Sequence, residues 1–204
     1  MTTTVVLATG NVKKLVELRR LVATAGADLA VLGLGDLPPY PEPAETERTF
    51  VGNALLKARA CVAATGLPAL ADDSGLAVDV LNGMPGVRSA RWSGPDATDA
   101  GNNALLLAQL DDVVDEQRTA HFEAAVALVL PDGRERTTTG RMDGRLLRAP
   151  IGENGFGYDP LFVATGYDVT TAELPPAEKD RISHRGQAVR AMVPVLLDEL
   201  RREA

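Results

Sequence analysis

The chain has 204 residues, of which 45% are hydrophobic and only 4% aromatic, so it can bury a full core filled mainly by aliphatic side chains. Lysine and arginine number 21 against 28 aspartates and glutamates, which gives a formal net charge of −7. Since a protein that binds long nucleic acids usually carries the opposite sign, this balance argues against polymeric DNA or RNA as the partner. A small anion stays open where lysines cluster or where a cation bridges it to carboxylates.

The sequence carries no sign of secretion or of membrane insertion. Cys61 is the only cysteine, which rules out a disulfide within the chain and fits a reducing compartment. The N-terminus has no basic region before its short apolar run, and no apolar stretch approaches the ~18 residues that cross a bilayer. We therefore expect a cytoplasmic protein with no membrane partner.

Strand and helix patterns alternate through the first half of the chain. Short apolar runs that end in turn residues indicate buried strands, and apolar residues at helical spacing indicate helices. In chain order we expect a strand at 5–8, a helix from Lys13 to about Ala25, a strand at 29–34, a Pro- and Glu-rich loop at 38–48, a helix from about Thr49, and strands at 69–71 and 76–81.

The second half predicts a hairpin between two helical segments. The expected elements are a loop at 82–86, a helix at 102–110, strands at 121–130 and 135–140 joined by a turn at 131–134, a glycine-rich loop at 152–157, a strand at 158–163, and a helix capped by Ser183 that runs to about Arg202. The alternation predicts an α/β fold with a mixed sheet, and residues 1–204 show no linker that would divide them into separate domains.

The segment from Thr9 to Lys14 (Thr-Gly-Asn-Val-Lys-Lys) joins the first strand to the first helix and is a candidate phosphate-binding turn. Such a junction exposes backbone N–H groups and the positive end of the helix dipole. Gly10 permits close approach of the backbone, and Lys14 can reach an anion. The segment matches neither the dinucleotide nor the P-loop pattern, so an ordinary turn with solvated lysines stays open.

A second candidate is Asp72-Asp73-Ser74-Gly75, which places two carboxylates at the end of a strand. Adjacent residues of an extended chain point to opposite faces, so only one aspartate enters a given site unless a turn intervenes. A carboxylate there can bind Mg²⁺ or deprotonate an attacking water. The alternative is a turn in which the aspartates bond local N–H groups.

The acidic stretch 42–47 precedes the helix in which Asn53 and Lys57, four residues apart, share one face. It is either a solvated loop or the source of a second metal carboxylate. The segment 155–160 (Gly-Phe-Gly-Tyr-Asp-Pro) offers aromatic rings that can stack on a base, although a turn before a buried strand explains the same residues. Lys179 and the segment 183–186 (Ser-His-Arg-Gly) gather cations at a helix start, where they are unfavourable unless a ligand compensates.

These segments occur together in one known family. The sequence resembles the Ham1-type pyrophosphatases of non-standard purine nucleoside triphosphates, also called inosine or xanthosine triphosphatases, over nearly its whole length. The matching motifs are, in order, 7–14, 45–50 with 53–58, 71–76, 83–86 with 89–91, 155–162, and 178–179 with 183–186. The resemblance implies an elongated, twisted mixed sheet flanked by helices, two lobes with a nucleotide cleft between them, and a homodimer.

The resemblance also implies two groups of substrate-binding residues. The group that would hold the triphosphate is Thr9, Gly10, Asn11, Lys14, Asn53 and Lys57. The group that would cradle the base and sugar is Phe156, Gly157, Tyr158, Asp159, Lys179, His184 and Arg185. Ser74 would also touch the substrate.

For the metal, the resemblance implies Mg²⁺ held by Glu45 and Asp73, with Asp73 as proton acceptor for water and Asp72 in support. Only the spacing to residues 49–50 selects Glu45 over its neighbours Glu42 and Glu47. The chain also departs from the family pattern, which often has Glu where this sequence has Gly52.

The implied reaction is attack of water between the α and β phosphates of inosine or xanthosine triphosphate, which releases the monophosphate and pyrophosphate. The 6-keto edge of the base would accept a hydrogen bond from His184 or Arg185. Two alternatives stay open: a nucleotide-sensing module without turnover, which needs no Asp73, and a pyrophosphatase for other modified or pyrimidine nucleotides.

Overall fold

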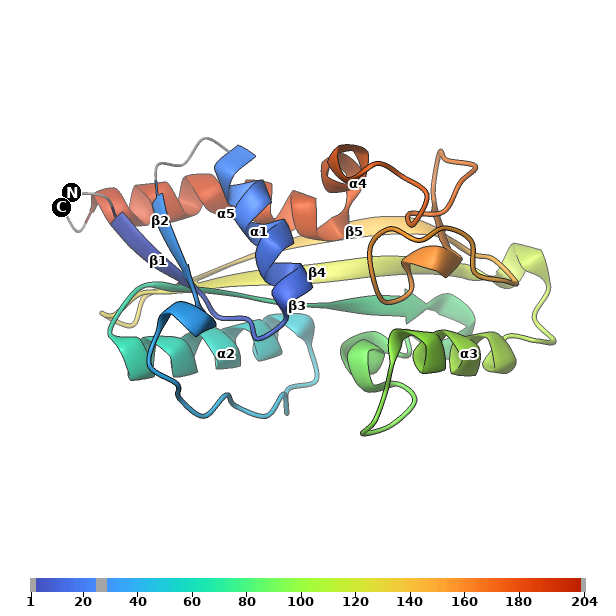
Figure 1. Ribbon diagram of the computed structural model, residues 1–204, viewed down its shortest axis with the longest axis horizontal. Helices are drawn as coiled ribbons and strands as arrows, with labels where there is room; N and C mark the ends of the chain where they lie inside the picture. Colours follow the sequence, from blue (N-terminus) through green and yellow to red (C-terminus); the bar gives the residue numbers. More distant parts are fainter. Residues whose placement is uncertain (1–2, 25–28, 203–204) are drawn as a thin grey trace. The chain divides into compact units, whose positions relative to one another are not determined.

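The computed structural model of the chain describes residues 3–24 and 29–202 and has an α/β fold (Figure 1). Within these residues six strands form one sheet in the order β2-β1-β3-β4-β5-β6. β1 pairs in parallel with β2 and β3, whereas β5 and β6 are antiparallel, so the sheet is mixed as predicted. The strands are β1 Thr3–Leu7, β2 Leu29–Gly33, β3 Ala69–Val78, β4 Thr119–Val129, β5 Glu135–Leu146 and β6 Phe162–Ala164.

The helices lie between and after these strands. The α-helices are α1 Val12–Thr24, α2 Phe50–Thr65, α3 Asp99–Gln109, α4 Pro176–Ile182 and α5 His184–Arg201, and the 3-10 helices are η1 Leu34–Asp36, η2 Asp79–Leu81, η3 Gly86–Arg91, η4 Asp115–Gln117 and η5 Asp159–Leu161. No helix in the described part of the chain is both long and apolar enough to cross a bilayer.

Helix α2 shows why the sequence folds as it does beside the candidate site. The Thr49 hydroxyl accepts a hydrogen bond from the Gly52 N–H at 3.0 Å, so a side chain satisfies one of the free donors at the helix start. The helix ends at Gly66, whose φ of 68° is the left-handed conformation that glycine adopts without strain. Phe50, Ala54, Ala58 and Cys61 follow one another at helical spacing and are all buried, so they form the apolar face of this helix.

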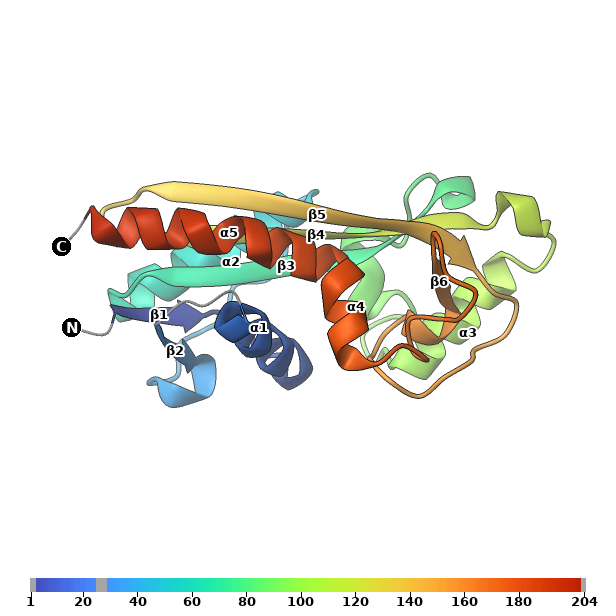
Figure 2. The same cartoon turned by 90° about the horizontal axis from the view of Figure 1, so that it is seen from above.

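The chain divides into two compact units, each with its own apolar core. The first unit consists of Met1–Asp73, Ala124–Gly140 and Arg185–Ala204, and the second of Ser74–Glu123 and Arg141–His184. Aliphatic residues of β1, α1, β4 and α5 form the core of the first, and α3 packs on Phe122 and Phe162 in the second. In the first unit α2 covers one face of β3, and α1 and α5 lie on the other face (Figures 1 and 2).

The expected break at residues 72–75 is wrong, because β3 runs without interruption from Ala69 to Val78. Gly75, which suggested a turn, serves a close approach of two backbones instead. A Cβ at Gly75 would lie 2.4 Å from the carbonyl oxygen of Gly86, so only glycine fits this position of the strand. The continuous strand decides the directions of Asp72 and Asp73.

Other boundaries differ from the sequence predictions. The predicted strand at 158–163 begins instead with η5, where Pro160 lacks the N–H that a ladder needs, and only Phe162–Ala164 form β6. Helix α3 starts before Asn102 because Thr98 caps it, and β5 continues to Leu146. Helix α4 was not predicted at all. The predicted end of the first helix, Ala25, lies outside the described residues.

Candidate active site

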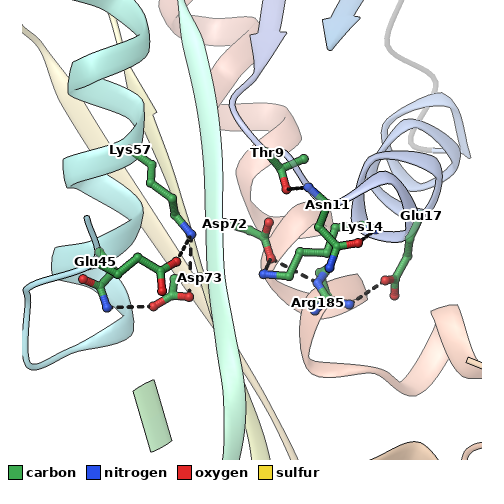
Figure 3. A network of polar contacts seen from close by, with 10 residues as sticks. Thr9, Asn11, Lys14, Glu17, Glu45, Lys57, Asp72, Asp73 and Arg185 are labelled. Carbon is green, nitrogen blue, oxygen red and sulfur yellow. Dashed lines mark hydrogen bonds and ion pairs between the residues drawn. The ribbon is translucent and has the colours of Figure 1, made fainter. Parts of the chain in front are cut away.

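Asp72 and Asp73 lie on opposite faces of β3, as adjacent residues of an extended strand must (Figure 3). Both are buried, with 1% and 5% of their surface exposed. Asp73 points toward α2 and the acidic loop, and Asp72 points toward α1 and the start of α5. The strand therefore separates two charged clusters within the first unit.

The Asp73 cluster joins four side chains from three elements. The Lys57 ammonium lies 3.0 Å from Glu45 Oε1 and 3.6 Å from Asp73 Oδ1. Asn53, one helical turn before Lys57, donates from Nδ2 to Asp73 Oδ2 at 3.0 Å. The helical spacing of Asn53 and Lys57 thus brings both onto one carboxylate, as the shared face predicted.

Asn53 is fully buried, and its amide is used at both ends. Its Oδ1 accepts the backbone N–H of Glu47 at 3.0 Å, while its Nδ2 binds Asp73. The first bond fixes the orientation of the amide, so its donor end faces the aspartate. Asn53 therefore ties the acidic loop to β3 and holds the Asp73 carboxylate in place.

Burial and charge shift the pKa values of this cluster. Burial raises the pKa of Asp73, and the nearby Glu45 carboxylate adds to the rise, which Lys57 only partly opposes. Burial disfavours the ammonium of Lys57, but neighbouring carboxylates outweigh it and raise the pKa of Lys57. An aspartate with a raised pKa is better suited than an ordinary one to accept a proton from water.

The donor set around Lys57 fits a divalent cation that also binds substrate. Two carboxylates already approach one positive charge here, and Mg²⁺ is commonly held by one or two carboxylates plus phosphate oxygens and waters. Across residues 3–24 and 29–202, no three His, Cys, Asp or Glu side chains converge as a complete metal site. A cation at Glu45 and Asp73 would therefore need oxygen ligands from outside the protein.

The three acidic residues of the loop have different positions. Glu45 lies with Lys57, whereas the Glu42 carboxylate lies against the first turn, where a Cβ on Gly10 would be 2.9 Å from its Oε1. Glu47 packs along Gly52 through its aliphatic carbons. In these contacts, Glu45 is the one whose carboxylate pairs with the ammonium that Asp73 also approaches.

The Asp72 cluster consists of three ion pairs, two of which share one oxygen of Asp72. Asp72 Oδ2 lies 3.1 Å from Lys14 Nζ and 3.2 Å from Arg185 Nε, and Arg185 Nη1 binds Glu17 Oε2 at 2.5 Å. Burial alone would raise the pKa of Asp72, but the charges of Lys14 and Arg185 hold it well below its usual range. Asp72 is thus a buried, fully ionised partner for two cations.

The first turn precedes α1 as predicted for a phosphate-binding segment. The Thr9 hydroxyl accepts the Asn11 N–H at 3.3 Å, and Asn11 Oδ1 accepts the Lys14 N–H at 3.2 Å (Figure 3). Gly10 and Asn11 are exposed, so an anion can reach their backbone. The Lys14 ammonium, however, already pairs with Asp72.

The predicted base-binding residues, Arg185 excepted, belong to the second unit, and three of them converge. Asp159 Oδ2 accepts from Lys179 Nζ at 2.5 Å and from the Phe156 N–H at 2.8 Å. Lys179 Nζ also lies 5.4 Å from the centroid of the Phe156 ring. Asp159 Oδ1 accepts from the Thr171 hydroxyl at 2.9 Å, so the carboxylate is held from both sides.

The other predicted residues have separate surroundings. Tyr158 is buried in the second core and donates its hydroxyl to the carbonyl of Ser89 at 2.9 Å. His184 is buried and stacks on Phe122, with ring centroids 4.8 Å apart and planes 9° apart. Ser74 lies half-buried on β3 directly after Asp73.

Sequence reasoning missed two partners of the predicted residues. Glu17 binds Arg185, and Phe122 stacks on His184. Glu17 follows Lys14 by three residues on the same helix, so helical spacing could have grouped it with the first turn. In the sequence, Phe122 was recognisable only as part of an alternating strand, and no local pattern indicated its contact with His184.

Comparisons with known proteins agree with this arrangement of motifs. The Ham1 family model matches residues 5–195. A dITP/XTP pyrophosphatase of Nocardia farcinica is 60% identical over 193 residues, which cover 94% of each chain. A crystal structure from Mycobacterium abscessus, described as a nucleoside-triphosphatase and dITP/XTP pyrophosphatase, is similar at 53% identity and a TM-score of 0.77, covering 95% of this chain and all of that one. A HAM1 protein from Coxiella burnetii gives 40% identity and a TM-score of 0.87, covering 97% of this chain and 100% of its own.

Proposed function

This chain belongs to the Ham1 family, and from that premise we propose that it hydrolyses inosine, deoxyinosine and xanthosine triphosphates to the monophosphate and pyrophosphate. The activity named for the similar Nocardia farcinica and Mycobacterium abscessus proteins supports this proposal. A homodimeric state and a cytoplasmic location stay predictions from the sequence.

The observation that carries the proposal is the cluster of Asp73, Asn53, Lys57 and Glu45. It combines an aspartate of raised pKa, an amide that orients it and an ammonium shared by two carboxylates. A sensing module without turnover would have no use for an aspartate prepared in this way. The cluster therefore favours hydrolysis over binding alone.

In this reaction Asp73 accepts the proton of the attacking water. Asn53 holds Oδ2 from one side, and Lys57 lies near Oδ1, so the carboxylate is fixed in one orientation before substrate binds. The water would then attack the α-phosphorus, and the bond to the bridging oxygen of pyrophosphate breaks. The proton on Asp73 returns to solvent when the products leave.

Positive charge must meet the pyrophosphate as it leaves. Glu45 and Asp73 would hold Mg²⁺, which would supply part of that charge. Lys57 stabilises phosphate oxygens from α2, and Lys14 with the exposed backbone of residues 9–11 does so from the start of α1. Asp72 holds Lys14 in position for this task.

For base recognition we propose residues of the second unit and, from the family resemblance, Arg185. Phe156 offers a ring for stacking, and the paired Asp159 and Lys179 offer an acceptor and a donor for the base edge and sugar. His184 or Arg185 donates to the 6-keto oxygen, which adenine lacks. From the family resemblance alone, we propose that one nucleotide uses both groups of residues.

Product analysis tests the proposed function. Inosine triphosphate with Mg²⁺ should give inosine monophosphate and pyrophosphate in equal amounts, and orthophosphate with inosine diphosphate would contradict the assignment. Values of kcat/KM for inosine, xanthosine, thymidine and guanosine triphosphates then separate a purine-directed enzyme from one for other modified nucleotides. In the same assay His184→Ala should erode the preference for inosine over adenosine triphosphate.

A further inference from the structure

The first turns of α3 have no role in the function proposed above, yet they carry three polar side chains directed at the predicted base loop or its support. Helix α3 starts at Asp99, after the Thr98 cap, and contains the buried residues Asn102 and Asn103. Both asparagines are nearly excluded from solvent, with 3% and 9% of their surface exposed. Because buried side-chain amides need hydrogen-bond partners, the contacts of these two asparagines show what the start of α3 holds in place.

Asp99 and Asn103 bind the two backbone groups of Gly157, a residue of the predicted base loop. Asp99 Oδ2 accepts the Gly157 N–H at 2.9 Å, and Asn103 Nδ2 donates to the Gly157 carbonyl at 3.0 Å. The two side chains are four residues apart and so share one face of α3. Gly157 has a φ of 63°, a left-handed conformation that leaves its backbone accessible to both.

The buried side-chain amide of Asn103 makes one hydrogen bond among the residues that the structure describes. Its Oδ1 is buried and has no hydrogen-bond partner among the residues that the structure describes. Burying a polar atom without a partner is unfavourable, so a structural role alone would be better served by an apolar side chain. The bond that the buried amide does make is the one to Gly157.

Asn102 provides a contrast, because both ends of its amide are used to hold a neighbouring segment. Its Oδ1 accepts the Ser93 N–H at 2.8 Å, and its Nδ2 donates to the Ser89 carbonyl at 3.3 Å. The same Ser89 carbonyl accepts the Tyr158 hydroxyl at 2.9 Å. Gly157 is therefore held directly by α3, and Tyr158 is held through a segment that α3 also fixes.

We propose that Asn103 and Asp99 are positioning residues for base recognition. By holding Gly157, they fix the direction in which the chain leaves Phe156 and enters Asp159. The Phe156 ring and the Asp159 carboxylate then keep the places that stacking and edge contacts to a purine require. This inference rests on the proposed function, because it takes residues 156–159 as the base loop.

The test compares Asn103→Ala with Gln109→Ala at the far end of the same helix, where Gln109 Oε1 accepts the Trp92 indole N–H at 2.8 Å. The readouts are KM and kcat for inosine triphosphate with Mg²⁺, and the inhibition constant of inorganic tripolyphosphate, which has no base. Asn103→Ala should raise KM about tenfold, the effect of one lost hydrogen bond, with kcat and the tripolyphosphate constant unchanged. Gln109→Ala should leave all three at wild-type values.

A second pair keeps the inference testable if Asn103→Ala folds poorly. Asp99→Asn retains an acceptor for the Gly157 N–H and should keep a KM close to wild type, whereas Asp99→Ala should raise it. The inference is overturned if Asn103→Ala and Asp99→Ala leave KM unchanged, or if KM and the tripolyphosphate constant rise together. Wild-type release of pyrophosphate decides the proposed function separately, so the two failures are distinguishable.

Discussion

Asp72 and Asp73 follow each other on β3 but meet different neighbours on its two faces. Asp72 faces two cations, Lys14 and Arg185, and its pKa lies well below the usual range. Asp73 faces one lysine that it shares with Glu45, and its pKa is raised. Both carboxylates are buried, so burial alone does not explain the difference.

The difference comes from how much opposite charge each aspartate receives. Two cations compensate the negative charge of Asp72, so its ionised form is favoured and stabilises the folded state. The negative charge of Asp73 is compensated incompletely, so its ionised form is destabilised. Binding of a proton or a cation would stabilise the carboxylate. One strand thus carries a carboxylate paired with two cations and a less compensated one, which we propose is the reactive group, and the packing of α1, α2 and α5 distinguishes them.

The largest effect should come from Asp73→Asn. This change removes the proton acceptor without altering shape, so kcat for inosine triphosphate should fall by about 10³-fold. Because a buried carboxylate of raised pKa opposes folding at neutral pH, the unfolding midpoint should equal or exceed that of the wild type. Pyrophosphate release and thermal unfolding measure the two quantities; unchanged turnover would remove Asp73 from the reaction.

Asp72→Asn, in contrast, should lower the stability of the fold and retain more turnover than Asp73→Asn. It leaves Arg185 and Lys14 buried with less compensation, and the free energy of unfolding should fall by about 3 kcal/mol. Denaturant titration measures this loss, and turnover per folded molecule should stay well above that of Asp73→Asn. If Asp72→Asn were as stable as the wild type and equally inactive as Asp73→Asn, the two faces would not differ as described.

Asn53→Ala tests whether the fixed orientation of the Asp73 carboxylate contributes to turnover. The change frees Asp73 Oδ2 and leaves the Glu47 N–H without its acceptor, so the carboxylate loses its fixed direction. We expect kcat to fall by about 10- to 100-fold. A loss confined to stability would show that Asn53 supports the loop without orienting Asp73.

The smallest expected effect is a change in Mg²⁺ dependence, which should distinguish the three acidic residues of the loop. Glu45→Gln should raise the Mg²⁺ concentration for half-maximal activity about tenfold, since it removes one of two proposed ligands. Glu42→Gln and Glu47→Gln are matched controls and should leave that concentration unchanged. A larger shift for Glu42→Gln than for Glu45→Gln would move the cation toward the first turn.

Local patterns in the sequence predicted most of the fold. The alternation of strands and helices, the start of α2 near Thr49 and the end of α5 near Arg202 all agree with the structure, because each depends on residues close in the chain. The continuous course of β3 could not be predicted. Gly75 and the two aspartates are turn residues by composition, and the approach of Gly86 from another segment is what explains Gly75.

The site was predictable as a set of motifs but not as an arrangement. Helical spacing grouped Asn53 with Lys57, whereas the ion pair of Arg185 with Glu17 joins helices at opposite ends of the chain. The different roles of Asp72 and Asp73 were predicted from the family resemblance alone, because two identical side chains next to each other give no local signal. Among Glu42, Glu45 and Glu47, only the spacing to residues 49–50 selected Glu45 from the sequence.

A crystal structure with Mg²⁺ and the α,β-methylene analogue of inosine triphosphate, which resists hydrolysis, tests the difference between the two faces most directly. We predict a cation about 2.1 Å from oxygens of Glu45 and Asp73, with the α-phosphate on the same face of β3. A cation and α-phosphate beside Lys14 and Asp72, with Asp73 contacting neither, would contradict the account.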